Sequence, residues 1–343
     1  MNKKHILNNI FKGVSLKHAL YKIWHYRNLM LILAYKGGDI IISLADLYRK
    51  SSGIGGATVC IACADDANVL EAVASARDIA KFILVGDIKK IRKVADSSKV
   101  DISGCIIVDE ANPVTACKVA AQFVSSGKAQ ALMKGRIDTS VIMKAVLEPE
   151  AGMRTGRKLS HLAVFELPTY HKLLFVTDAA INISPEISTK KEIINNAVEA
   201  VLALGITRPK VALLAAKEKA DPKMPVTTDA VELVAHHRTL QLKGAGGGAL
   251  AQKYILDGPL ALDNAICPES IKIKGIESPV EGDADILVCP NIESGNILYK
   301  ALAFLAKAKV GGVVLGAKRP IIMTSRADSA ESKLISIALG ILS

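Results

Sequence analysis

Short apolar runs alternate with amphipathic helical segments along most of this 343-residue chain. In the first half, strands are expected at 58–62, 82–85, 106–108 and 131–133. Helices are expected between them, near 68–79, 89–95 and 113–125. A strand, a helix and a second strand in this order form a parallel pair with the helix packed across it. The alternation therefore predicts an α/β protein whose sheets are rich in parallel strands and covered by helices.

The same alternation resumes after residue 160. Strands are expected at 162–166, 173–177, 211–214, 254–257 and 286–289, and the last apolar runs are 311–315 and 321–323. With 50% hydrophobic residues, the chain can bury two sizeable cores. Aromatic residues make up only 4%, so these cores must be aliphatic. We expect a basic N-terminal extension (1–52), a first α/β domain (53–160 plus 311–343) and a second α/β domain (161–310).

The positive charge is concentrated in the N-terminal segment. Residues 1–50 hold nine Lys or Arg and two Asp, which is +7 of the total +11 and leaves +4 for the other 293 residues. A nucleic-acid binder would need a basic stripe on its folded surface, so this role is disfavoured. The apolar run 29–34 is far shorter than the roughly 20 residues of a membrane span. A basic helix could contact a membrane surface, but packing on the first domain or on a second copy is favoured.

The cysteines and histidines form no recognisable metal site. Cys60 and Cys63 form a CxxC pair within an apolar stretch that is typical of a buried strand, with no second pair nearby. His236 and His237 are adjacent, so they would diverge by about 100° on a helix. The remaining cysteines are scattered, as is usual in a reducing cytoplasm, and no secretory signal is evident. We therefore expect a cytoplasmic protein without a metal.

Polar residues follow the last predicted strand. Ser325 and Arg326 come directly after it, and Asp328 and Glu331 begin a helix that runs to Leu342. Open α/β sheets bind ligands at the carboxyl ends of their strands. A helix N-terminus and an arginine fork both suit a phosphate or carboxylate. The alternative is a helix cap beside a solvated arginine.

Two further strand ends carry polar or glycine residues. Gly295 and Asn296 follow the strand at 286–289, with Lys300 in the helix after them. The strand ending near residue 133 is followed by Lys134, Gly135, Arg136, Thr139 and Lys144, and Arg154 comes shortly afterwards. Several such loops at strand ends predict one shared anion-binding cleft.

With these segments the sequence resembles the phosphate acetyltransferase and phosphate butyryltransferase family. These enzymes exchange an acyl group between coenzyme A and inorganic phosphate. Five segments carry the resemblance in the family's order: 131–147, 161–185, 257–265, 285–302 and 316–334. The stretches GPLALDN and SRADS and the Lys134-Gly135 pair resemble the butyryl branch more than the acetyl branch.

The resemblance implies two lobes of α/β sheets flanking a cleft, as in isocitrate and isopropylmalate dehydrogenases, and a homodimer or higher oligomer. It implies direct transfer without a cofactor, with acyl-CoA, CoA, inorganic phosphate and acyl phosphate as substrates. Arg326 is expected to hold the phosphate or the oxyanion, and Ser325 to donate a hydrogen bond. Asp328 is assigned to orient Arg326 and Glu331 to act as the base. The remaining anion pocket would comprise Lys134, Gly135, Arg136, Thr139, Lys144, Arg154, Gly295, Asn296 and Lys300.

Two departures of this sequence from the acetyl branch leave alternative functions open. The acetyl branch has a carboxylate six residues after the arginine, where this chain has Ser332, and an arginine where this chain has Phe304. The missing carboxylate leaves room for a non-enzymatic binding protein. A membrane-surface, acyl-carrier-dependent phosphate acyltransferase is another alternative. A dehydrogenase of the same fold is disfavoured, since Asp257 and Asp263 are its only obvious pair of metal-binding aspartates.

Overall fold

The computed structural model describes residues 41, 43–244, 248–325 and 328–343. The described residues belong to one compact unit, Ile40–Ser343. Its first helix, α3 (Leu44–Ile54), begins with a capping box at Ser43 and buries Leu47 completely. The packed unit therefore begins before residue 53, within the segment expected to form an extension.

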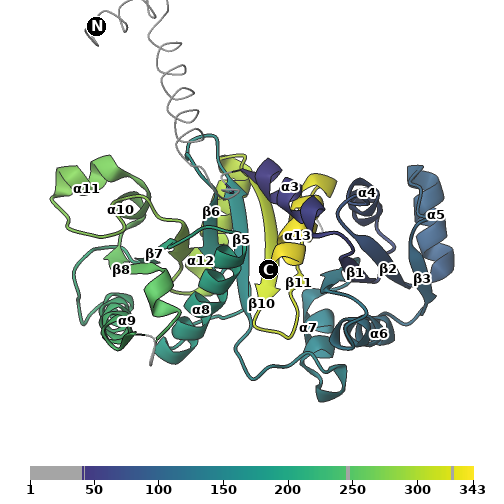
Figure 1. Cartoon of the computed structure of the whole chain (residues 1–343), viewed down its shortest axis with the longest axis horizontal. Helices are drawn as coiled ribbons and strands as arrows, with labels where there is room; N and C mark the ends of the chain where they lie inside the picture. The colour runs from purple at the N-terminus through teal and green to yellow at the C-terminus, as the bar shows by residue number, and fades with distance from the viewer. Residues whose placement is uncertain (1–40, 42, 245–247, 326–327) are drawn as a thin grey trace, which may run out of the picture. The chain divides into compact units, whose positions relative to one another are not determined.

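The described strands form one sheet of 11 strands, in the order β3-β2-β1-β4-β11-β10-β5-β6-β9-β7-β8 (Figure 1). The first five in sequence are β1 (Thr58–Ala62), β2 (Lys81–Gly86), β3 (Ile106–Asp109), β4 (Ala131–Lys134) and β5 (Ser160–Glu166). The others are β6 (Leu174–Thr177), β7 (Lys210–Leu214), β8 (Ile255–Leu260), β9 (Ile286–Val288), β10 (Lys309–Leu315) and β11 (Ile321–Ile322). The expectation of separate sheets is therefore corrected.

The two halves are joined because β10 pairs on both sides. It runs antiparallel to β5 over seven residue pairs and antiparallel to β11, which in turn runs parallel to β4. β5 and β6 are also antiparallel, while the strands toward both edges of the sheet pair in parallel. Parallel pairing was predicted correctly for the flanks but not for the centre. The short connection between β10 and β11 makes an antiparallel pair, because a parallel pair needs a long crossover.

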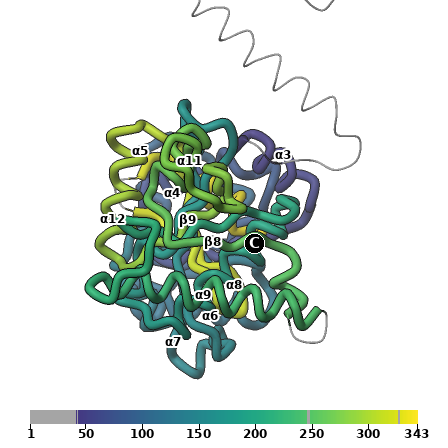
Figure 2. Tube along the Cα trace, turned by 90° about the vertical axis from the view of Figure 1, so that its left-hand side faces the viewer, coloured from purple at the N-terminus to yellow at the C-terminus, as the bar shows by residue number. Residues whose placement is uncertain are grey.

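Helices cover both faces of this sheet. They are α4 (Ala67–Ser75), α5 (Ile88–Ser98), α6 (Pro113–Ser125), α7 (Thr139–Leu147), α8 (Ile187–Ala203), α9 (Pro225–Leu242), α10 (Leu262–Ile266), α11 (Pro268–Lys274), α12 (Ile292–Lys300) and α13 (Ala330–Leu342). Figure 1 shows α4 and α6 on opposite sides of β1 and β2. Viewed from the β8 end in Figure 2, α11 lies above β8 and α9 below it. No helix among the described residues is long and apolar enough to span a bilayer.

The hydrophobic core is continuous on one face of the sheet and divided on the other. Successive side chains of β10 alternate between the faces, and Val313 and Leu315 join a cluster that extends through both halves. On the opposite face, Val314 packs in a cluster with α6 and α7, while Val310 packs in another with α12. Gly312 lies between these two on β10. We call this boundary between the two clusters the seam.

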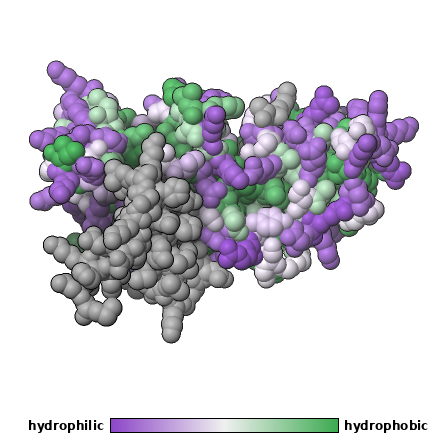
Figure 3. Space-filling model, turned by 90° about the horizontal axis from the view of Figure 1, so that it is seen from above, coloured by the Kyte–Doolittle hydropathy of each residue, from purple (hydrophilic) through white to green (hydrophobic). Residues whose placement is uncertain are grey.

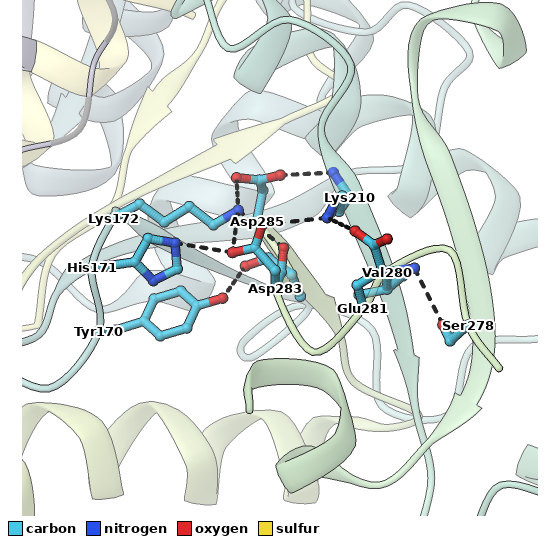
Figure 4. Close-up of polar contacts among 10 residues, drawn as sticks. Tyr170, His171, Lys172, Lys210, Ser278, Val280, Glu281, Asp283 and Asp285 are labelled. Atoms are coloured by element: carbon cyan, nitrogen blue, oxygen red, sulfur yellow. Dashed lines mark hydrogen bonds and ion pairs between the residues drawn. The ribbon is translucent and has the colours of Figure 1, made fainter. Parts of the chain in front are cut away.

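A charged network ties together the starts of β6, β7 and β9 (Figure 4). Lys172 Nζ lies 2.7 Å from Asp285 Oδ1 and 3.2 Å from Asp283 Oδ1, and His171 Nε2 lies 3.0 Å from Asp283 Oδ1. Lys210 Nζ reaches Glu281 at 2.8 Å. These groups lie at the opposite ends of β6 and β9 from Asp178 and Cys289, so they stabilise the second half without entering the seam. The face seen in Figure 3 is mostly hydrophilic, with smaller apolar areas.

Candidate functional site

The described residues after β11 (324, 325, 328 and 329) are held by polar groups of this segment. Ser325 N donates to Asp328 Oδ2 at 2.6 Å, and Asp328 N donates to Ser325 O at 3.2 Å. Ser329 caps α13 by accepting a hydrogen bond from Ser332 N. The predicted helix is confirmed, but it begins at Ala330, so Asp328 lies before it. Ser325 is exposed and follows the buried residues 321–324. Arg326 lies outside the described residues.

The end of β4 packs against the end of β1 through a glycine. Gly135 N donates to Ala62 O at 2.9 Å, and Arg136 N donates to Cys63 O at 2.7 Å. A Cβ added to Gly135 would lie 2.1 Å from Cys63 O, so only glycine fits at this position. Lys134 is buried, and its Nζ donates to Ile137 O at 3.1 Å. The buried ammonium therefore supports this turn, while Arg136 is exposed.

The start of α12 packs against the segment that follows β6. A Cβ on Gly295 would lie 2.3 Å from Asp178 O, and Asn296 Nδ2 donates to Ala179 O at 3.2 Å. The Asp178 carboxylate is buried and accepts hydrogen bonds from the backbone N–H groups of Ala180 and Ile181 at 2.9 and 3.0 Å. Gly295 thus allows α12 to approach Asp178 closely.

His161 on β5 connects these two regions at the seam. A Cβ on Gly312 would lie 2.8 Å from His161 Nε2, so the imidazole lies directly over this glycine. Its Nδ1 is buried and has no hydrogen-bond partner within the described part of the chain. Burial lowers the pKa of His161, although the carboxylates of Asp178 and Asp328 act in the opposite direction. The ring is therefore neutral at pH 7.

Tyr299 completes the link from the side of α12. Its ring makes edge-to-face contacts with His161 and Phe165, with centroid separations of 6.0 and 5.3 Å. Burial raises the pKa of Tyr299, and the nearby carboxylate of Asp328 raises it further. Asp328 thus acts electrostatically on both rings. The last turn of α12 therefore lies beside His161 at the centre of the sheet, and Asp328 acts on both rings from the segment after β11.

Other predicted residues are exposed to solvent. Glu331 is exposed and its carboxylate lies 2.7 Å from Lys309 Nζ. Thr139, Lys144 and Lys300 are exposed on α7 and α12. Arg154 is exposed, and the neighbouring Met153 accepts a hydrogen bond from Lys318 N, in the turn at the opposite end of β11 from Ser325. Phe304 is 65% exposed, so it does not line an enclosed pocket.

The cysteine interpretation agrees with the structure. Cys60 is buried in β1 and Cys63 follows at its end, and all six cysteines are free thiols. The neighbouring Cys117 thiol lowers the pKa of Cys63, with a smaller contribution from Lys134. Among the residues described, no group of His, Cys, Asp and Glu could hold a metal ion.

Comparisons with known proteins agree on one class, the acyltransferases that use phosphate. The family described as Phosphate acetyl/butaryl transferase matches residues 109–341. The chain is 44% identical to the probable phosphate butyryltransferase of Bacillus subtilis (strain 168), over 88% of this chain and 97% of that protein. It is 40% identical to the phosphate acetyltransferase of Thermotoga maritima, over 83% and 94%.

A solved structure supports the same assignment. The branched-chain phosphotransacylase from Enterococcus faecalis V583 aligns with a TM-score of 0.72 and 35% identity, covering 83% of this chain and 98% of that one. The chain therefore belongs to the phosphate acetyl/butyryl transferase family. The predicted family is confirmed, and the protein is a phosphate acyltransferase. The likeness to dehydrogenases stays a prediction.

Sequence reasoning did not assign roles to His161, Asp178, Tyr299 or Lys333. Asp178 could have been noticed, because it is a charged residue directly after an apolar strand. His161 lies inside a strand, and Tyr299 and Lys333 lie inside helices, where a polar side chain is usually solvated. Only the packing of distant segments shows that these three side chains are buried or half-buried beside the candidate site.

Proposed function

We propose that this enzyme exchanges a short acyl group between coenzyme A and inorganic phosphate at the seam, with Ser325 and Arg326 at the reacting centre. The observation that carries this proposal is that the end of β11 and the last turn of α12 meet around His161: Met323 N donates to the O of Gly312 beneath the ring, and Tyr299 contacts the ring edge-to-face. The Asp328 carboxylate acts electrostatically on His161 and Tyr299, while Gly295 and Asn296 pack against the backbone of Asp178 and Ala179. The exposed Arg136 and the buried Lys134 add positive charge at the neighbouring strand end.

The reaction requires a few polar groups and no change of oxidation state. In the direction that consumes CoA, the thiol sulfur attacks the acyl phosphate carbonyl, the new C–S bond forms and phosphate leaves with the electrons of the C–O bond. Arg326 would neutralise the phosphate or the oxyanion through its bidentate fork, and Ser325 would donate a hydrogen bond. A carboxylate accepts the thiol proton. Because Glu331 is paired with Lys309, Asp328 is the better candidate for this base.

Several features of the enzyme belong to the same proposal. Direct transfer between a thioester and phosphate needs no resident cofactor, and coenzyme A takes part as a substrate. We propose a cytoplasmic enzyme that forms a homodimer or a larger homo-oligomer, which sedimentation equilibrium of the full chain would test. The alternative of an acyl-carrier-dependent enzyme at a membrane depends on the basic N-terminal segment, residues 1–50, of which residues 1–40 and 42 lie outside the described part. Flotation with anionic vesicles would test that alternative.

We propose butyryl-CoA as a better substrate than acetyl-CoA, because the GPLALDN and SRADS segments resemble the butyryl branch. Each additional buried methylene contributes roughly 0.8 kcal/mol, so two carbons allow a preference of about tenfold or more in kcat/KM. The measurement is phosphate-dependent CoA release from acetyl-, propionyl-, butyryl- and longer acyl-CoA. An equal or inverted preference would reject the butyryl assignment and leave the acyltransferase assignment intact. No release with any of these substrates would reject both.

A further inference from the structure

Lys333 is a buried lysine beneath the candidate loop. It lies in the first turns of α13, and only 2% of its surface is exposed. Its Nζ donates to Asp328 O at 2.8 Å and to Ser325 O at 3.3 Å. One ammonium therefore binds the backbone carbonyl oxygens of two residues of the proposed site, Ser325 and Asp328. Burying a charge is costly unless it is paired or hydrogen-bonded, so these contacts are required for Lys333 to stay charged.

A second segment of the chain meets the same point. Asn68 Nδ2, on α4, lies 3.5 Å from Asp328 O, and the carboxylate of Asp66, which caps α4, acts on Lys333. The loop after β11 is thus connected to the segment after β1, about 260 residues away in sequence. Carbonyl groups of an irregular loop need donors when they are removed from water, and an apolar side chain at position 333 would supply none.

We propose that Lys333 is a positioning residue for acyl transfer: its ammonium fixes the backbone at Ser325 and Asp328 and keeps a positive charge beneath the phosphate site. This inference rests on the proposed function, because it assumes that Ser325 and Asp328 act on the substrates. Lys333 need not touch them. It acts by holding two residues that do.

The inference has a consequence for the pH dependence. Burial lowers the pKa of Lys333, although the carboxylates of Asp66 and Asp328 oppose this shift. The charged form holds the loop, so activity should fall as the pH rises through a pKa below that of an ordinary lysine. Arginine stays charged over the accessible pH range. The fall in activity at alkaline pH should therefore move to higher pH in Lys333→Arg.

The test compares Lys333→Met, Lys333→Arg and Lys172→Met in the full chain. Lys172 provides the matched control, because it is also largely buried and hydrogen-bonds a backbone carbonyl, Asp283 O at 3.0 Å, but belongs to the network in Figure 4. The assay is phosphate-dependent CoA release. In the alkaline pH range where the fall in activity is measured, inorganic phosphate is already dianionic. We expect Lys333→Met to lower kcat/KM by about 100-fold, as for a small misplacement of reacting groups. Lys172→Met should reduce thermal stability and leave kcat/KM per folded molecule unchanged.

Each result decides the inference. It is overturned if folded Lys333→Met keeps more than about a third of wild-type kcat/KM, or if Lys333→Arg is active and its alkaline fall coincides with that of the wild type. If Lys333→Met does not fold, the pH profiles of wild type and Lys333→Arg decide. If wild type releases no CoA from any acyl-CoA, the proposed function fails separately. Calorimetry with inorganic phosphate then tests Lys333: weaker binding by Lys333→Met supports its role at an anion site, and equal binding overturns it.

Discussion

At the scale of single residues, two carboxylates near the start of α13, Asp328 and Glu331, are three residues apart in sequence but have different partners. The Asp328 carboxylate accepts a hydrogen bond from Ser325 N and acts electrostatically on His161 and Tyr299, while Glu331 is paired with Lys309 on the surface. Both lie near the start of one helix, so sequence spacing predicts that they share a face. The start of α13 at Ala330 leaves Asp328 in the loop and places only Glu331 on the helix.

This difference predicts unequal effects of neutralising the two acids. Asp328→Asn should lower kcat by about 10²–10⁴, with partial recovery at higher pH in the direction that consumes CoA, because solvent then forms the thiolate. Glu331→Gln should stay within about twofold of wild type, since exposed ion pairs contribute little. Initial rates between pH 6 and 9 provide the measurement. A steep, pH-rescued loss in Glu331→Gln instead would restore the assignment made from sequence.

At the scale of secondary-structure elements, glycines set the distances between strand ends and helices. Gly135 lets the end of β4 contact the backbone after β1, and Gly312 leaves room for the His161 ring above β10. Gly295 lets α12 approach the segment after β6. Glycine is required at these positions because a Cβ would overlap with neighbouring atoms, and not because the backbone has an unusual conformation.

Gly295→Ala should therefore disturb both packing and catalysis. Its Cβ would lie 2.3 Å from Asp178 O and 3.0 Å from Ala179 Cα, so α12 must move. Overpacking of this kind costs about 1–3 kcal/mol. Urea unfolding and kcat/KM for acyl-CoA give the two readouts. Gly104→Ala is the control, because a Cβ there has no atom of the described chain within 4 Å. Wild-type stability and activity in Gly295→Ala would show that α12 adjusts freely.

At the scale of the whole molecule, one sheet carries both halves, and the charged network at the starts of β6, β7 and β9 stabilises the second half. Burial by itself would raise the pKa of Asp283, but the contacts with His171 and Lys172 outweigh it and hold this pKa well below the usual 3.8. A carboxylate with a lowered folded-state pKa stabilises the protein above its unfolded-state pKa. This contribution is lost as the pH falls toward the folded-state value.

The free energy of unfolding of the wild type should therefore decrease as the pH is lowered from about 5 to 3. Asp283→Asn should be less stable at pH 7 by about 1–3 kcal/mol and should lose part of this pH dependence. Thermal unfolding across this pH range is the measurement. Glu281→Gln is the control, since its carboxylate is 72% exposed and its pair with Lys210 should contribute little. An unchanged pH dependence in Asp283→Asn would exclude this network as its source.

The sequence by itself determined the elements and the family, because both are local properties. Apolar periodicity marks β1 to β4 and their helices, and the segments around Ser325, Gly295 and Lys134 carry the resemblance that the comparisons confirm. The elements at the two ends of the sheet follow from that pattern, since parallel strands need helical crossovers.

Tertiary structure alone decided how the halves join and which side chains meet. Local sequence contains no information on whether β10 pairs with one neighbour or two, so the single sheet could not be predicted from it. The same holds for His161 above Gly312, for Lys333 beneath Ser325, and for Glu331 turned toward Lys309. Each of these contacts joins residues on different elements, and its geometry depends on how the strands and helices pack.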